Sequence, residues 1–439
     1  MSVVGTIMGH EDKRSLTLVV KQTTPRKLKS IDLFAGCGGL SLGLEMAGFE
    51  TVFVNELHPD AMQTFLINRP NSNLSKKGNH INDIFSLTKT TKDLAAFKIR
   101  VQKEHGEIDL VCGGPPCQGY SGIGHRRTFK LNKEEVPTNH LYREMAKVVK
   151  AIAPKIFLFE NVRGLLNSKW TPDGESGEIW QDVRRTFEKI NVEINGKSYK
   201  YNIGWQLVFA KDYGVPQNRP RVIMIGIRGD IPFITNLDFQ HKGLLPPITS
   251  GAPDLVELLS DLSDPKWKPG GTMNFYKKDP LTPIQKSLRT RPDGTLMGKG
   301  DLVTDHEYSN HSDEIVKKFR YMIKNKSKIP ENMKTKKFSQ KVLPKKWGKK
   351  GPSITATSMP DDYVHFQQPR VLTVREWARL QTFPDWYTFT GKRTTGGRRR
   401  AGNPEAGEWT RDVPKYTQIG NAVPVELARV IGEHLKKLI

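Results

Sequence analysis

The sequence has few cysteines and no long apolar segment. Its 439 residues include three cysteines, Cys37, Cys112 and Cys117. That is too few for a disulfide framework, and their spacing is not that of a zinc site. No apolar run approaches the roughly 18 residues of a membrane span, and residues 1–25 lack the continuous apolar stretch of a secretory signal. We expect a soluble cytoplasmic protein in which residues 1–25 form an N-terminal extension.

Acidic residues are outnumbered by basic ones. The chain has 69 Lys and Arg against 46 Asp and Glu, a formal charge of +23. An excess of this sign suits a polyanion such as nucleic acid. Much of this positive charge comes from residues 317–350, which contain 14 basic residues and one acidic residue. The Gly/Arg-rich stretch 391–411 adds six basic residues and two acidic residues. Such runs can bind phosphates or can simply be solvated loops, so charge alone leaves both interpretations open.

The first half of the chain predicts an α/β domain. Short apolar runs typical of buried strands alternate with helix-like stretches, and they fall at residues 31–34, 51–54, 108–112, 156–159, 206–209 and 222–227. This alternation indicates a parallel sheet covered by helices. Between the third and fourth runs, Leu141, Met145, Val148, Val149 and Ile152 mark one face of a helix.

The second half is less regular. From about Asp230 the sequence is punctuated by proline and glycine and shows little periodicity, so we place a domain boundary there. After Pro424 the apolar positions 427, 430, 431, 435 and 438 again have helical spacing. We expect this last helix to return to the first domain.

A glycine-rich turn follows the first strand. Residues 32–41 read D-L-F-A-G-C-G-G-L-S, in which glycines let the backbone approach a ligand closely. Glu56 lies about 20 residues later, after the second strand, where a carboxylate can accept hydrogen bonds from both ribose hydroxyls. Asp83 could bind an exocyclic amine. Neither a complete G-x-G-x-x-G motif nor a Walker lysine is present. We therefore predict an adenosine-containing cofactor without a pyrophosphate, although such a turn can also be purely structural.

The third strand leads into G-G-P-P-C-Q, residues 113–118. Two prolines fix the backbone before Cys117, which would lie at the carboxyl end of the sheet, where α/β proteins bind ligands. Cys117 is therefore a candidate nucleophile. Cys112, inside the strand, and Cys37, in the glycine turn, are interpreted as buried structural residues.

Two further groups follow later strands. Glu160 ends the fourth strand beside the Cys117 loop, where partial burial could keep it protonated as a proton donor. It could equally cap the next helix. Arg219 and Arg221, in Q-N-R-P-R, precede another strand and suit an anionic or carbonyl-bearing ligand. A surface pair is the simpler interpretation.

Taken in order, these motifs resemble those of the C5-cytosine DNA methyltransferases of bacterial restriction-modification systems. The resemblance rests on D-L-F-A-G-C-G-G-L-S, P-P-C-Q, E-N-V, Q-N-R-P-R, R-V-L-T-V-R-E-W-A-R-L-Q-T-F-P at residues 370–384 and Q-I-G-N-A-V-P at 418–424. It implies an α/β, Rossmann-like domain that uses S-adenosyl-L-methionine, built from residues 26–240 and completed by 411–439. A smaller, irregular target-recognition domain would occupy 241–410.

The resemblance also assigns residues. Cofactor contacts would come from Phe34, Ala35, Gly36, Gly38, Gly39, Leu40, Glu56, Asp83, Pro116, Leu141, Asn421 and Ala422. Cys117 would attack C6 of the cytosine, Glu160 would act at N3, and the Arg219–Arg221 motif would contact O2 through its second arginine. The target base must leave the duplex, because C5 and C6 are inaccessible within the stack.

The resemblance further implies partners and exclusions. We expect double-stranded DNA as substrate, S-adenosyl-L-homocysteine as product and no metal. We also expect a monomer in a bacterial cytoplasm, with a cognate restriction endonuclease as a candidate separate partner.

Two alternative functions are those of a related RNA methyltransferase and of a non-catalytic DNA-binding regulator. The RNA enzymes typically carry C-F-T and K-G-Y near the end, which this chain lacks, and a regulator would be expected to have lost Cys117 or Glu160. The DNA sequence recognised, which depends on roughly 240–368, cannot be deduced.

Overall fold

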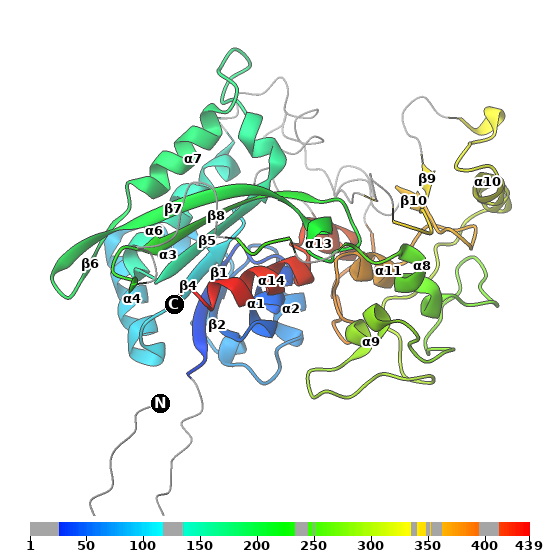
Figure 1. Ribbon diagram of the computed structural model, residues 1–439, viewed down its shortest axis with the longest axis horizontal. Coiled ribbons are helices and arrows are strands. Elements are labelled where there is room, and N and C mark those ends of the chain that lie inside the picture. Colours follow the sequence, from blue (N-terminus) through cyan, green and yellow to red (C-terminus); the bar gives the residue numbers. More distant parts are fainter. Residues whose placement is uncertain are drawn as a thin grey trace, which may run out of the picture.

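The computed structural model describes residues 26–116, 134, 136–232, 245–248, 251–334, 340–347, 352, 362–394 and 412–439. The expected N-terminal extension, Cys117 and residues 395–411 of the Gly/Arg-rich stretch lie outside these ranges. We call residues 26–232 and 412–439 the large lobe and residues 251–394 the small lobe, in each case for the described residues (Figure 1).

Within the described residues, one sheet of eight strands forms the centre of the large lobe, in the order β3-β2-β1-β4-β5-β8-β7-β6. The strands are β1 (Leu28–Leu33), β2 (Phe49–Asn55), β3 (His80–Ile81), β4 (Leu110–Gly113), β5 (Ile156–Val162), β6 (Asn191–Ile194), β7 (Lys197–Phe209) and β8 (Pro220–Arg228). All six runs predicted from the sequence overlap one of these strands. The α/β, Rossmann-like fold class is confirmed.

The prediction of a wholly parallel sheet is wrong for its last part. β1 to β5 pair in parallel, but β8 runs antiparallel to β5 and to β7, and β6 is antiparallel to β7. A turn at Asn195 and Gly196, both with positive φ, joins β6 to β7, and no helix separates these two strands. A direct turn of this kind makes neighbouring strands antiparallel.

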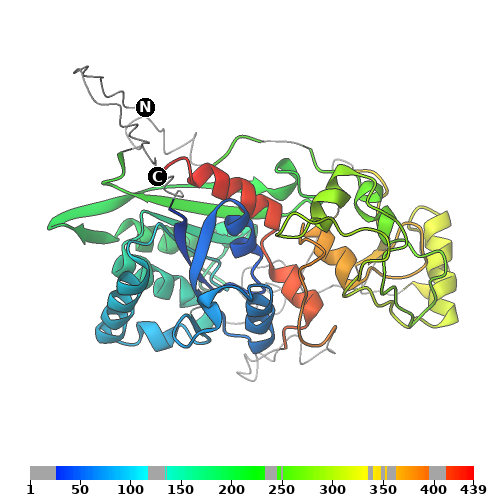
Figure 2. The same ribbon diagram turned by 90° about the horizontal axis from the view of Figure 1, so that it is seen from below.

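Both faces of the sheet are covered, so its strands are apolar on both sides. On β5, Phe157 and Phe159 pack with α3 (Phe85–Thr88), α4 (Thr91–His105), α6 (Leu141–Ile152) and α7 (Glu178–Glu188). Ile156 and Leu158 belong to the opposite face, beneath α1 (Gly39–Met46) and α14 (Val425–Leu435). Figure 2 shows α14 on one side of the sheet and the group of α4 on the other. The helix predicted from Leu141 to Ile152 is confirmed.

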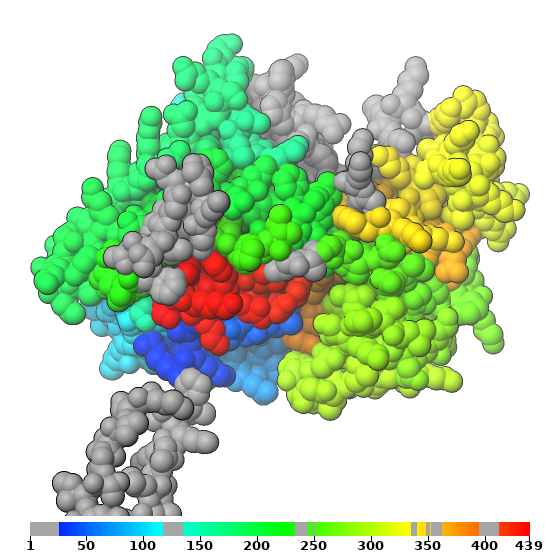
Figure 3. Space-filling view, in the orientation of Figure 1, coloured from blue at the N-terminus to red at the C-terminus, as the bar shows by residue number. Residues whose placement is uncertain are grey.

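The C-terminal helix returns to the large lobe, as predicted, although it ends at Leu435 rather than Leu438. It crosses α1 at Gly43, where an added Cβ would lie 2.3 Å from the Val425 carbonyl oxygen. Figure 3 shows this C-terminal segment seated between the first strands and the region of β7 and β8. The described part of the chain contains no helix with both the length and the apolar character needed to cross a membrane.

The small lobe contains short elements. They are α8 (Leu255–Leu259), α9 (Pro283–Arg289), α10 (Asp313–Lys324), β9 (Lys341–Val342), β10 (Tyr363–Val364) and α11 (Val374–Leu380). The prediction of little periodicity is wrong for α10, because Ser312 caps it and Val316, Phe319 and Met322 form its buried face. The basic run that starts at residue 317 therefore begins inside a helix.

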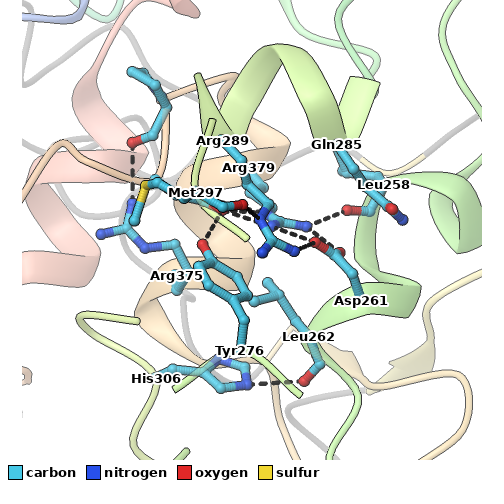
Figure 4. Close-up of polar contacts among 12 residues, drawn as sticks. Leu258, Asp261, Leu262, Tyr276, Gln285, Arg289, Met297, His306, Arg375 and Arg379 are labelled. Atoms are coloured by element: carbon cyan, nitrogen blue, oxygen red, sulfur yellow. Dashed lines mark hydrogen bonds and ion pairs between the residues drawn. The ribbon is translucent and has the colours of Figure 1, made fainter. Parts of the chain in front are cut away.

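Charged side chains fill much of the small-lobe interior. Asp261 accepts hydrogen bonds from Arg289 and from Arg379, and Arg379 also binds Asp385. The Tyr276 hydroxyl donates to Asp385, and all five side chains are almost completely buried. Figure 4 shows Asp261 facing both Arg289 and Arg379. Each carboxylate thus faces at least one guanidinium, which compensates the cost of burying charge.

Candidate functional site

The glycine turn between β1 and α1 has an unusual backbone. Phe34, Gly36 and Gly38 have φ of 58°, 57° and 86°, a region that side chains other than glycine rarely occupy. No atom of the described residues lies within 4 Å of the position of a Cβ at Gly36, so the turn is open there with respect to this part of the chain. At Gly39, an added Cβ would lie 2.4 Å from the Val423 carbonyl oxygen. The turn is thus open on one side and closed on the other by the C-terminal segment.

Glu56 is tied directly to this turn. Its carboxylate accepts hydrogen bonds from the backbone N–H of Gly36 and from that of His58, both at 2.8 Å. The side chain follows β2, whose last residue, Asn55, accepts from the N–H of Ala35 at 2.9 Å through its carbonyl. The two neighbouring strands therefore bring Glu56 to the glycine turn, as the sequence predicted.

The other expected cofactor residues surround the turn less closely. Asp83 is exposed beyond β3, where its carboxylate accepts the N–H of Phe85 at 3.0 Å. Leu141 is buried in the apolar cluster against which Phe34 packs.

Asn421 is exposed at the end of α13 (Lys415–Asn421), and Ala422 lies 3.2 Å from the Cβ position of Gly39. Leu40, at the start of α1, packs on the opposite face of the sheet. Pro116 is half-buried at the edge of the described residues.

A second group of polar side chains lies at the ends of β4 and β5. The Asn161 amide donates to the Pro115 carbonyl at 3.1 Å, which fixes the start of the loop that leads to Cys117. Glu160 points towards this loop, because a Cβ added to Gly114 would lie 2.7 Å from Glu160 Oε2. Gly114 therefore leaves the space that the Glu160 carboxylate occupies.

Glu160 forms an ion pair with Arg221, at 2.5 Å between Oε1 and Nε, and both residues are buried. Arg219, also buried, donates to the Gly420 carbonyl at 2.6 Å. Burial and the nearby charge of Arg221 lower the pKa of Arg219. The interpretation of these arginines as a surface pair is wrong, since β8 carries them into the interior.

Three motifs that are far apart in the sequence meet behind this group. Gln217 donates to the Leu380 carbonyl at 3.0 Å, and the Gln381 amide donates to the Ile419 carbonyl at 2.7 Å. One hydrogen-bonded layer is thus formed by residues 217–221, 370–384 and 418–424.

The remaining cysteines behave as predicted: Cys37 and Cys112 are completely buried, and burial raises the pKa of both thiols.

Three polar residues around the glycine turn were not predicted from the sequence. Asp32 is buried and accepts a hydrogen bond from Ser41 at 2.5 Å, and burial raises its pKa to about 7. Arg69 and Tyr387 contact the other side of the turn. Asp32 stands in the glycine motif, but its burial is not visible in the sequence. Arg69 and Tyr387 belong to no recognised pattern and come from distant segments.

Comparison with known proteins gives consistent matches over most of the chain. The family model for C-5 cytosine-specific DNA methylase matches residues 28–437. The type II methyltransferase M.DdeI of Desulfomicrobium norvegicum is 33% identical over 422 residues, covering 92% of this chain and 88% of that protein. The type II methyltransferase M1.HphI of Haemophilus parahaemolyticus is 28% identical over 417 residues, covering 94% and 87%.

A solved structure shares the fold. It is described as a DNA modification methyltransferase encoded within a prophage (E. coli), and it superposes with a TM-score of 0.63 at 24% identity. The match covers 94% of this chain and 99% of the other. The arrangement of both lobes is therefore one that a complete known chain also adopts.

Proposed function

The chain belongs to the C-5 cytosine-specific DNA methylase family and is a DNA (cytosine-5-)-methyltransferase, and from this premise we propose how its residues act. The substrate is a cytosine in a specific double-stranded sequence, turned out of the helix before reaction. The enzyme modifies DNA for a type II restriction-modification system, a role supported by the names of its relatives. A separate endonuclease would share its recognition sequence.

The observation that carries this proposal is the buried pair of Glu160 and Arg221 beside Gly114, at the start of the Cys117 loop. A carboxyl group and a guanidinium held side by side match the N3 and O2 edge of cytosine. In its acid form, Glu160 protonates or hydrogen-bonds N3 of the bound base. Arg221 then stabilises negative charge on O2. Arg219 holds the Q-N-R-P-R motif in position through its hydrogen bond to the Gly420 carbonyl.

Cys117 supplies the covalent step. Its thiolate adds to C6, which makes C5 nucleophilic enough to accept a methyl group. A base then removes the C5 proton, the bond between sulfur and C6 breaks, and the thiolate is restored. Cytosine C5 is too weak a nucleophile without this addition. Cys117 lies outside the described residues, so its role depends on the sequence and on the geometry of residues 113–116.

The glycine turn suits S-adenosyl-L-methionine, which supplies an electrophilic methyl group. Gly36 is open to a ligand, and the Glu56 carboxylate lies beside it to bind ribose hydroxyls. Phe34, Ala35, Gly38, Gly39, Leu40, Pro116, Leu141, Asn421 and Ala422 would form the surrounding cradle, with Asp83 at the adenine amine. Glu56→Ala should weaken cofactor binding in calorimetry and leave DNA affinity nearly unchanged. Equal cofactor affinity in the variant and the parent would reject this assignment.

Cys117→Ala tests the proposal as a whole. Bisulfite sequencing of DNA from cells that express the parent should reveal methylated cytosine in one recurring sequence, and the variant should produce none. DNA with 5-fluorocytosine at that site should trap the parent covalently, because fluorine cannot leave as a cation, and should not trap the variant. Cys112→Ala is the control, since a buried strand cysteine affects stability alone. Methylation by Cys117→Ala, or an adduct on another cysteine, would disprove the mechanism.

A further inference from the structure

A segment of the small lobe contacts the cofactor turn of the large lobe. The Tyr387 hydroxyl donates a hydrogen bond to the Cys37 carbonyl at 2.6 Å, within the glycine turn. A Cβ added to Gly38 would lie 2.8 Å from the same hydroxyl, so the tyrosine lies directly against the turn. We propose that Tyr387, supplied by the small lobe, is a positioning residue for the cofactor site in the large lobe. This inference rests on the proposed cofactor.

The turn needs such support because of its backbone. Phe34 adopts a positive φ without being glycine, an unfavourable conformation that persists only where the surrounding structure enforces it. Gly36, whose N–H binds Glu56, and Gly38 also have positive φ, which glycine adopts freely, so the backbone of the turn has more conformational freedom at these positions. A fixed donor on the Cys37 carbonyl restricts the turn between these residues. Cofactor binding then requires less ordering of the backbone.

The orientation of the tyrosine hydroxyl is itself fixed from the large lobe. Arg69 donates to the Tyr387 hydroxyl at 3.2 Å, so the hydroxyl acts as acceptor from Arg69 and as donor to Cys37. Arg69 is held in turn by the Glu45 carboxylate on α1, at 2.8 and 3.0 Å, and by stacking on Phe65. The hydroxyl therefore has one available direction for its proton, towards the turn.

The backbone of Tyr387 is anchored in the small lobe. Arg375, on α11, donates to the Tyr387 carbonyl at 2.7 Å and to the Pro384 carbonyl at 3.2 Å. Asp385 binds Arg379 in the buried charge cluster. Beyond Tyr387, the Thr388 carbonyl and N–H bind the Asn68 amide at 2.8 and 2.9 Å. The segment is thus fixed at both ends and joins the two lobes through the cofactor turn.

Tyr387→Phe removes the hydroxyl and keeps the ring. Tyr201→Phe is the matched control, because the Tyr201 hydroxyl also donates to a backbone carbonyl, that of Pro154 at 2.7 Å, in a buried position far from the turn. Calorimetry with S-adenosyl-L-homocysteine and full-length, DNA-free protein should give about tenfold weaker binding for Tyr387→Phe, as expected for one buried hydrogen bond. Tyr201→Phe should bind like the parent.

Kinetics separate positioning from general loosening. For Tyr387→Phe, KM for S-adenosyl-L-methionine should rise about tenfold, while KM for DNA and kcat at saturation stay unchanged. Parent-like cofactor affinity in Tyr387→Phe, or equal weakening in both variants, would overturn the inference. If Tyr387→Phe does not fold, Arg69→Lys decides, since it keeps the charge and removes the guanidinium contacts to the Tyr387 hydroxyl and to the Gly38 carbonyl. Cofactor binding should then be weaker than in the parent, and an affinity equal to that of the parent would overturn the inference. A parent protein that binds no cofactor would instead refute the proposed function.

Discussion

The two lobes bury their interiors in different ways. In the large lobe, a regular sheet presents apolar side chains such as Phe157 and Leu158 to helices on each face. In the small lobe, short elements surround buried arginines, among them Arg289 and Arg379, which are paired with carboxylates. A sheet satisfies its own backbone, whereas irregular loops leave carbonyls without partners. Arginine can donate to several carbonyls at once, so it holds such loops in place.

The largest effect should follow from removing Asp261. Asp261→Ala leaves Arg289 without its carboxylate and Arg379 with Asp385 alone. Breaking a buried ion pair by removing one partner typically costs about 3–5 kcal/mol, and we expect a decrease of that size in the free energy of unfolding. Urea unfolding followed by circular dichroism measures it. A decrease below about 1 kcal/mol in the free energy of unfolding would show that the buried ion pairs of Asp261 contribute no more to stability than exposed ion pairs do.

Leu158→Ala is the corresponding change in the large lobe. Leu158 is completely buried, and a leucine truncated in such a core typically costs about 2–5 kcal/mol, because apolar packing is removed and a cavity remains. We expect a loss near the middle of that range in the same urea experiment. High salt should leave this loss unaltered, because no charge is involved. A strong dependence on salt would contradict the contrast between the lobes.

The lobes should also respond to pH with opposite signs. Burial raises the pKa of Asp32 to about 7, so the folded state holds a proton that the unfolded state has released between about pH 4 and 7. Stability then falls as pH rises, by up to about 1.4 kcal/mol per pH unit. Asp32→Asn should flatten this decline. An unchanged profile in the variant would show that Asp32 is not the group responsible.

Two buried histidines give the small lobe the reverse response. Burial lowers the pKa of His306 to about 4 and that of His365 to about 3. Between these values and about 6.5, the unfolded state binds protons that the folded state does not, so stability rises with pH in this window. Hydrogen exchange should therefore show the small lobe opening more easily at pH 5 than at pH 7. Protection that stays constant in α8 and α11 would contradict this.

The smallest effect concerns the exposed basic face of α10. Lys317, Arg320 and Lys324 are spaced along one exposed side of this helix. Changing all three to glutamine should weaken DNA binding equally on all sequences. The slope of log K against log salt should become shallower by about 0.9 for each phosphate that the helix no longer neutralises. An unchanged slope would indicate that these three basic residues are simply solvated and do not contact DNA phosphates.

The lysines of α4 provide the control for that measurement. Lys92, Lys98 and Lys103 lie on a helix of the large lobe, packed on the face opposite α14. Three glutamines there remove the same charge. Equal effects of the two triple variants would indicate that net charge, rather than the position of α10, determines the slope.

The sequence predicted what depends on local pattern. The helix from Leu141 to Ile152 followed from periodicity, and six strands followed from short apolar runs. Glu56 lies at the glycine turn because neighbouring parallel strands end at one edge. The antiparallel strands were not foreseen, since the pattern of a buried strand carries no direction. Tyr387 could not be found because its partners, Cys37 and Arg69, are 350 and 318 residues away. Such contacts are decided by tertiary packing.

The close crossing of α14 over α1 has a consequence for the order of folding. Gly39 and Gly43 lie against the backbone of Val423 and Val425, so the back wall of the glycine turn is made by a segment that is distant in the sequence. Bringing such distant segments together is a slow step in folding. We therefore expect the glycine turn to be completed late in folding, when α14 packs on α1.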